Sequence, residues 1–133
     1  MATTIQAYQA YSPRVTIERV MEMDQVEAFI EDRTGFNDST IHGVLRELHS
    51  ALLFYARQGY SIRLDGVGLF SPTIDKDGNF SLNVRPDKKL LLRFNDEGKF
   101  YGRLRNKDMI EKTEDDYIQR WNDEHPKDKI KKK

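Results

Sequence analysis

The stretch from residue 59 to residue 70, GYSIRLDGVGLF, constrains the fold of this chain more than any other. It follows a long amphipathic segment, and apolar and polar residues alternate from Ile62 to Asp65, the period of a strand with one solvent-exposed face. Gly66 and Gly68 then bracket one residue, which predicts a tight corner between two strands because glycine accepts positive φ and close backbone approach. Helix, corner and paired strands predict a small α+β domain rather than a helical bundle or a doubly wound sheet.

Two amphipathic helices are expected before this corner. The first runs over residues 25–33 with Asp24 as its N-cap. The second is longer, is capped by Asn37 or Asp38, and ends at Gly59. Its apolar residues recur every three or four positions and form one stripe: Ile41, Val44, Leu45, Leu48, Leu52, Tyr55 and Ala56.

Three strands and a short helix are expected next. The strands at 61–65 and 67–74 flank the corner, and Asp77-Gly78 predicts a hairpin turn into a return strand. That strand alternates through Phe80, Leu82 and Val84. Asp87, which follows a proline, predicts the cap of a helix over residues 88–94.

The two ends of the chain carry weaker patterns. Residues 3–10 and 14–21 alternate loosely, and in the second stretch Val15, Ile17 and Val20 predict one face of a strand or the entry from a strand into a helix. Residues 95–102 contain two glycines and are expected to form a loop. Asn106 is the expected cap of a last amphipathic helix, whose Trp121 anchors it to the body of the protein or to a partner subunit.

Composition narrows the functional class. The chain has 133 residues and no cysteine, which predicts one domain with tails and excludes disulfides and thiolate metal sites. No window approaches about 18 consecutive apolar residues, and the N-terminal residues lack a secretory pattern, so a soluble intracellular protein is expected. Net charge is zero, yet residues 57–105 carry ten basic and six acidic side chains, which favours a polyanionic partner for this segment.

Other chemistry is poorly supported by the residue patterns. The acidic run DKDGN at 75–79 lacks the glycine and glutamate spacing of a calcium loop, and Gly66-Val67-Gly68 precedes a strand rather than the helix that a nucleotide loop requires. His42 and His49 are seven residues apart, too far for one metal ion on a helix. We therefore expect no enzyme activity, metal, cofactor or small-molecule substrate, and core or interface positions for most aromatic residues.

Residues 26–90 resemble the bacterial histone-like HU and integration host factor family. The resemblance rests on two helices joined by a short turn, the sequence Ile62-Arg63-Leu64 followed by Gly66-Val67-Gly68-Leu69-Phe70, and the run Val84-Arg85-Pro86-Asp87-Lys88-Lys89-Leu90. It implies an α+β fold with a two-helix base, a three-stranded antiparallel sheet with a short hairpin, a short helix and a C-terminal helix. It also implies intertwined dimers whose strands form a saddle, with long β-arms that enter the minor groove and bend DNA.

The chain departs from the family in its arms. The connection SPTIDKDGN, between Phe70 and Phe80, suffices only for a tight hairpin and lacks the Arg-Asn-Pro tip of the family. DNA contact is therefore expected from the floor of the saddle rather than from a proline at an arm tip that wedges between base pairs. The expected organisation is an N-terminal extension (1–23), an HU-like domain (24–95), a C-terminal extension with a helix (96–126) and a basic disordered tail (127–133).

The resemblance predicts a bacterial, cytoplasmic, nucleoid-associated homodimer that binds the phosphate backbone of double-stranded DNA without sequence preference. Lys88 matches a basic position of the family, and helix N–H groups there would favour phosphate. The full set of candidate DNA-binding residues is Arg63, Lys76, Arg85, Lys88, Lys89, Arg93, Arg103 and Arg105. The alternative is a scaffold or interaction protein that keeps the fold but has lost strong DNA binding.

Overall fold

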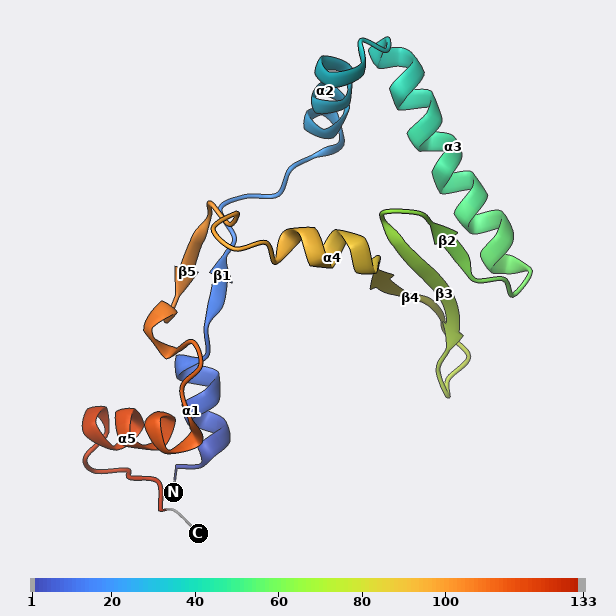
Figure 1. Cartoon of the computed structure of the whole chain (residues 1–133). Helices are drawn as coiled ribbons and strands as arrows, with labels where there is room; N and C mark the ends of the chain where they lie inside the picture. Colours follow the sequence, from blue (N-terminus) through green and yellow to red (C-terminus); the bar gives the residue numbers. More distant parts are fainter. Residues whose placement is uncertain (1, 132–133) are drawn as a thin grey trace. The chain divides into compact units, whose positions relative to one another are not determined.

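The computed structural model describes residues 2–131 and shows mixed helices and strands, with every strand pairing antiparallel. The chain divides into two compact units, each described by itself below (Figure 1). The central unit is Val20–Phe100. The terminal unit combines the described parts of Met1–Arg19 and Tyr101–Lys133, so most of the two predicted extensions fold together.

The central unit begins with the two predicted helices, α2 (Met23–Thr34) and α3 (Asp38–Arg57). Helix α2 begins earlier than predicted, because Glu22 rather than Asp24 takes the N-cap position, and the Glu22 backbone N–H donates to the Gln25 side-chain oxygen at 2.7 Å. It ends at Gly35, whose φ of 73° is left-handed. The side chain of Asn37 accepts the Ser39 backbone N–H at 2.8 Å and confirms the predicted cap of α3.

A three-stranded antiparallel sheet and a short helix complete the central unit. The strand order is β2-β3-β4, and the helix follows directly. The predicted corner and hairpin turn are confirmed, with Gly66 at φ 80° and Gly78 at φ 87°. Asp87 caps the helix as predicted. The elements are β2 (Ile62–Leu64), β3 (Gly68–Ile74), β4 (Phe80–Pro86) and α4 (Lys88–Phe94).

The terminal unit packs two helices and a two-stranded ribbon around its own core. Helices α1 and α5 contact each other, and β1 pairs with β5 (Figure 1). The strand at 103–105 was not predicted. The elements are α1 (Thr4–Tyr11), β1 (Arg14–Thr16), β5 (Arg103–Arg105), the 3-10 turn η1 (Lys107–Met109) and α5 (Glu114–Glu124).

The loose alternation of residues 3–10 does not produce a strand, because residues 4–11 form α1. Thr3 and Gln6 make a reciprocal capping box, with the Thr3 hydroxyl accepting the Gln6 N–H and the Gln6 side chain accepting the Thr3 N–H. Ala7 and Tyr11, four residues apart, are both buried. The burial therefore follows the helical period rather than the loose alternation of the sequence. The second expected stretch does contain a strand, at residues 14–16.

The expected cap of the last helix is also wrong. Asn106 has a left-handed φ of 55° and precedes only the short turn η1. Glu111, which is also left-handed at φ 63°, lies between this turn and the last helix. Helix α5 begins at Glu114, after Thr113 and Asp116 form a second reciprocal capping box. Three acidic residues in its first turn complement the positive end of the helix dipole.

The predicted disordered tail is docked in its described part. The indole N–H of Trp121 donates to the Asp128 carbonyl at 2.8 Å, and Asn122 exchanges two hydrogen bonds with the backbone of Ile130. Ile130 is buried, and the Ala2 N–H donates to the Asp128 carboxylate at 3.0 Å. Residues 132 and 133 of the predicted tail lie outside the described residues.

Burial is distributed very unevenly between the units. In the described part of the chain, the buried apolar residues of the central unit reduce to Ile41, whereas the rest form one cluster in the terminal unit. Trp121 belongs to that cluster, which confirms its anchoring role. The cluster consists of Ala2, Ala7, Tyr11, Met109, Tyr117, Ile118, Trp121 and Ile130. The terminal unit thus has its own core, while the central unit leaves many large apolar side chains exposed.

Tyr11 links α1 to α5 and provides a pH-dependent test of the terminal core. Its hydroxyl donates to the Glu124 carboxylate at 2.5 Å, and the Arg120 guanidinium lies 4.4 Å from its ring centre. Burial, and next the hydrogen bond to Glu124, raise the pKa of Tyr11 from 10.0 to about 12. Because folding favours the neutral hydroxyl, its stabilisation is fully present below pH 10 and is lost as the pH rises through 12.

We expect Tyr11→Phe to lower the free energy of unfolding by about 1 kcal/mol near neutral pH, because the carboxylate loses its donor. In a titration followed by tyrosinate absorbance, the transition near pH 12 should vanish in this variant. Tyr101→Phe is the control, since Tyr101 is 84% exposed and should leave unfolding unchanged. A transition near pH 12 that persists without Tyr11 would contradict this assignment.

Candidate nucleic-acid interface

The pairing register of the central sheet separates its side chains onto two faces. Residues directly opposite each other in antiparallel strands point to the same side, and alternate residues along a strand point to opposite sides. The register therefore assembles one polar face, which consists of Arg63, Leu69, Arg85, Ser71, Asn83, Thr73 and Ser81. The other, apolar face carries Ile62, Phe70, Val84, Pro72, Leu82, Ile74 and Phe80.

Two of the predicted DNA-binding residues meet on the polar face. Arg63 on β2 lies opposite Leu69 on β3, and Leu69 lies opposite Arg85 on β4. The two guanidinium-bearing residues thus flank one central strand, and both are exposed. None of the strand positions of this face is acidic, so both charges are available to an anion.

Hydroxyl and amide groups continue the polar face toward the hairpin. The Ser61 hydroxyl donates to the Ser71 hydroxyl at 3.0 Å, and the Thr73 hydroxyl donates to the Ser81 carbonyl at 3.4 Å. Asn83 lies opposite Ser71. These residues were not predicted as candidates, although their alternation with Phe70, Pro72 and Leu82 indicates the solvent-exposed side of the strands. Such groups contact phosphate and sugar in protein–DNA interfaces.

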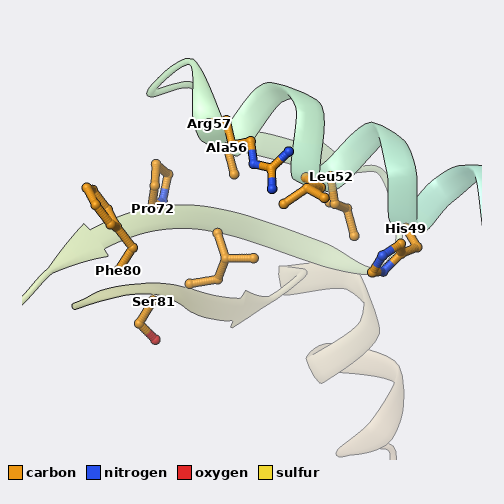
Figure 2. Close-up of a pocket in the computed structure, with 9 residues that line it drawn as sticks. His49, Leu52, Ala56, Arg57, Pro72, Phe80 and Ser81 are labelled. Atoms are coloured by element: carbon orange, nitrogen blue, oxygen red, sulfur yellow. The ribbon is translucent and has the colours of Figure 1, made fainter.

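Helix α3 lies over the apolar face and leaves a groove of about 720 Å³. Figure 2 shows Pro72 and Phe80 on the side of the strands that faces α3, whereas Ser81 points to the opposite side. The residues of α3 that line the groove are His49, Leu52, Leu53, Ala56 and Arg57. Because α3 occupies this side, the polar face remains the solvent-exposed surface of the sheet.

Close approach of β4 to Gly68 maintains the register that aligns the two arginines. Gly68 is buried and pairs with Leu64 on one side and Pro86 on the other. A Cβ atom at this position would lie 2.6 Å from the Arg85 backbone carbonyl oxygen. Any side chain here would push β4 away from β3, so the glycine is required by the sheet itself.

Lys76, a third predicted residue, lies in the hairpin turn beyond the strands. It stands between Asp75 and Asp77, and the Asp75 carboxylate accepts backbone N–H groups of Asp77 and Asn79 at 2.8 and 2.9 Å. The Asn79 N–H, and after it that of Asp77, hold the pKa of Asp75 below its usual range. The turn therefore carries two carboxylates and one ammonium, which makes it a poor contact for a polyanion.

Lys88, Lys89 and Arg93 are exposed residues of α4. Lys89 and Arg93 are four apart and share one side of this short helix. The Asp87 carboxylate accepts the N–H groups of Lys89 and Leu90 at 3.0 and 3.4 Å. These helix-terminal donors are therefore already used by the chain, contrary to the expectation that they would favour phosphate.

Arg103 and Arg105 belong to the terminal unit, where they lie on β5. Arg103 forms an ion pair with Glu18 at 3.3 Å, and both side chains are largely exposed. The predicted residues are therefore divided between two units, with Arg63 and Arg85 brought together on one sheet and the others on separate elements.

The described residues contain no group of three or more potential ligands that could hold a metal ion. His42 instead pairs with Glu27 of α2, with Nδ1 2.6 Å from the carboxylate, and so connects the two helices. Within the described part of the chain, no helix has the length and apolar character needed to cross a membrane.

Comparison with known proteins gives one family match. A family model described as an HU domain fused to wHTH, Ig, or glycine-rich motif (HU-HIG) matches residues 3–112. The match covers the whole central unit and much of the terminal unit. A search of curated proteins finds no significant match.

We expect Gly68→Ala to destabilise the central unit by about 1–3 kcal/mol, because the added methyl group collides with the Arg85 carbonyl. Denaturant unfolding at fixed protein concentration measures the change. Gly43→Ala on α3 is the matched control: apart from the neighbouring backbone of its own helix, no atom lies within 4 Å of the added Cβ, and alanine favours the helix by up to about 1 kcal/mol. Equal stability of wild type and Gly68→Ala would show that the strands do not approach this closely.

Proposed function

The chain belongs to the HU-HIG family, and we propose that it is an architectural protein that binds double-stranded DNA through its central sheet. At the level of the family, the HU domain is a DNA-binding domain. We propose further that contact is made with the phosphate backbone and without sequence preference. The bound protein would then be part of the bacterial nucleoid and would need no catalytic activity or cofactor.

The observation that carries this proposal is the shared position of Arg63 and Arg85. They lie on the solvent-exposed face of one sheet, on either side of Leu69, with hydroxyl and amide groups beyond them. Arginine presents a planar fork of donors that suits phosphate oxygens. The strand backbone fixes the spacing of the two side chains, so less conformational entropy is lost on binding than for residues of a mobile loop.

The number of contacts predicts weak, salt-dependent binding. Arg63, Arg85 and a lysine at the start of α4 would neutralise about three phosphates per subunit, and each contact contributes about 0.9 to the slope of log affinity against log salt. Zero net charge removes the general attraction that a strongly basic protein has for DNA. The short hairpin also argues against a wedge in the minor groove, since its turn carries Asp75 and Asp77 instead of a proline tip.

We propose that a second copy of the chain covers the apolar surface of the central unit. Large apolar side chains remain 40–81% exposed there, among them Phe29, Val44, Phe54, Phe80 and Leu82. Contiguous apolar surface on a monomer marks an interaction site. The groove beneath α3 offers a place for an apolar element of the partner, as the intertwined dimers of the HU type require.

The second candidate is a scaffold that keeps the fold without useful DNA affinity. It is favoured by the zero net charge and by the carboxylates of the hairpin turn. The two candidates differ in the polar face: a scaffold does not need Arg63 and Arg85, whereas a DNA-binding protein does.

We expect Arg63→Gln and Arg85→Gln each to weaken binding to duplex DNA by about tenfold near 0.1 M salt and to lower the salt slope by about one. Fluorescence anisotropy over a salt series, with two duplexes of unrelated sequence, measures both quantities. Arg46→Gln removes the same charge from an exposed position on α3 and serves as the control. Absence of binding by the wild type at low salt would favour the scaffold instead.

We expect light scattering to give twice the chain mass of 15.6 kDa. Leu53→Glu should shift the protein to monomer, because it places a charge in the groove beneath α3. Gly43→Glu introduces the same side chain into open space on the polar side of this helix and should leave the dimer intact. A wild-type monomer at micromolar concentration would refute the second-copy proposal.

A further inference from the structure

The β1–β5 ribbon of the terminal unit gathers three arginines on one face. Arg14 lies opposite Arg105, and Thr16 lies opposite Arg103. Alternate residues and directly opposed residues point to the same side, so these four side chains share one face while Val15 and Leu104 share the other. Arg14 was not recognised in the sequence, because only the pairing of two segments 89 positions apart places it beside Arg105.

Hydrogen bonds hold this ribbon in place at the end of α1. The Asn106 amide donates to the carbonyls of Ala10 and Ser12 at 3.1 and 3.3 Å, which ties the end of β5 to the turn between α1 and β1. The Arg14 guanidinium donates to the Gln9 carbonyl at 3.0 Å. Within the described part of the chain, no other hydrogen bond or ion pair occupies its remaining donors. The arginines are therefore carried by a fixed element rather than by a flexible extension.

The charges of this face are not balanced within the described residues. Like charges directly opposite each other destabilise a strand pair, and Arg14 and Arg105 have that arrangement. Glu18 pairs with Arg103, but an exposed pair of this kind contributes little. In the described part of the chain, the Arg105 side chain has no carboxylate partner, whereas Arg120 of the same unit is paired with both Asp108 and Glu124.

We propose that this arginine face is a second binding surface for the phosphate backbone of duplex DNA. The inference deepens the proposed function and rests on it: the central sheet supplies one contact and the terminal ribbon another. An anion between Arg14 and Arg105 would remove their repulsion, and the guanidinium forks match phosphate oxygens. The side chains of this face are three arginines and one threonine, which suit phosphate contact, so we expect the surface to add affinity rather than sequence preference.

The test measures salt-dependent binding of the full chain to a fluorescently labelled duplex. We expect the double variant Arg14→Gln/Arg105→Gln to weaken binding by about tenfold or more and to lower the salt slope by about two. Its thermal midpoint should be equal to or above that of the wild type, because cross-strand repulsion is removed. Lys112→Gln, which removes one exposed positive charge of the same unit outside the ribbon, is the control and should change the slope much less.

The outcomes separate this inference from the proposed function. If Arg63→Gln and Arg85→Gln weaken binding while the ribbon variant does not, the ribbon inference is overturned and the sheet proposal stands. If only the ribbon variant weakens binding, the sheet proposal is overturned and the ribbon inference stands. If Lys112→Gln lowers the salt slope as much, for each charge removed, as the ribbon variant does, the ribbon surface is overturned and general electrostatic attraction explains the binding. A wild type that does not bind DNA overturns both.

Discussion

The antiparallel ladder between β3 and β4 is the constraint on which the rest of the central unit depends. It pairs Leu69 with Arg85 and thereby places that arginine on the same face as Arg63. A shift by one residue would move the whole polar set to the side covered by α3. Gly68 allows this register, because the Arg85 carbonyl occupies the space that any side chain would need. The candidate interface is therefore a consequence of backbone approach at one residue.

The two units differ in how far they bury their apolar side chains. The terminal unit joins both chain ends around Tyr11 and Trp121, and the described part of the tail closes this core through Asp128 and Ile130. The central unit covers one face of a sheet with one long helix and leaves large apolar groups in solvent. This difference is why a second copy is proposed for the central unit, whereas the terminal unit has a core of its own.

Much of the central unit was predictable from the sequence. The apolar stripe of α3, the cap at Asn37, the Gly66 corner and the cap at Asp87 are local signals whose causes lie within a few residues. The terminal unit was predicted poorly for the same reason. Its strand β5 is three residues long and forms only because β1 pairs with it, and the tail is ordered by contacts with α5. The β1–β5 pairing connects segments about ninety residues apart and leaves no local pattern.

For the candidate interface, most of the residues able to bind an anion, and most of the helices, turns and caps of the central unit, could be predicted from local patterns, because propensity, periodicity and glycine conformation act within a few residues. The tertiary structure alone decided which of those residues act together. Register brought Arg63 and Arg85 onto one face, placed Arg14 beside Arg105, and isolated Lys76 among carboxylates. The physical reason is that a side chain's neighbours across a sheet are set by backbone hydrogen bonds between distant segments, which no single segment encodes.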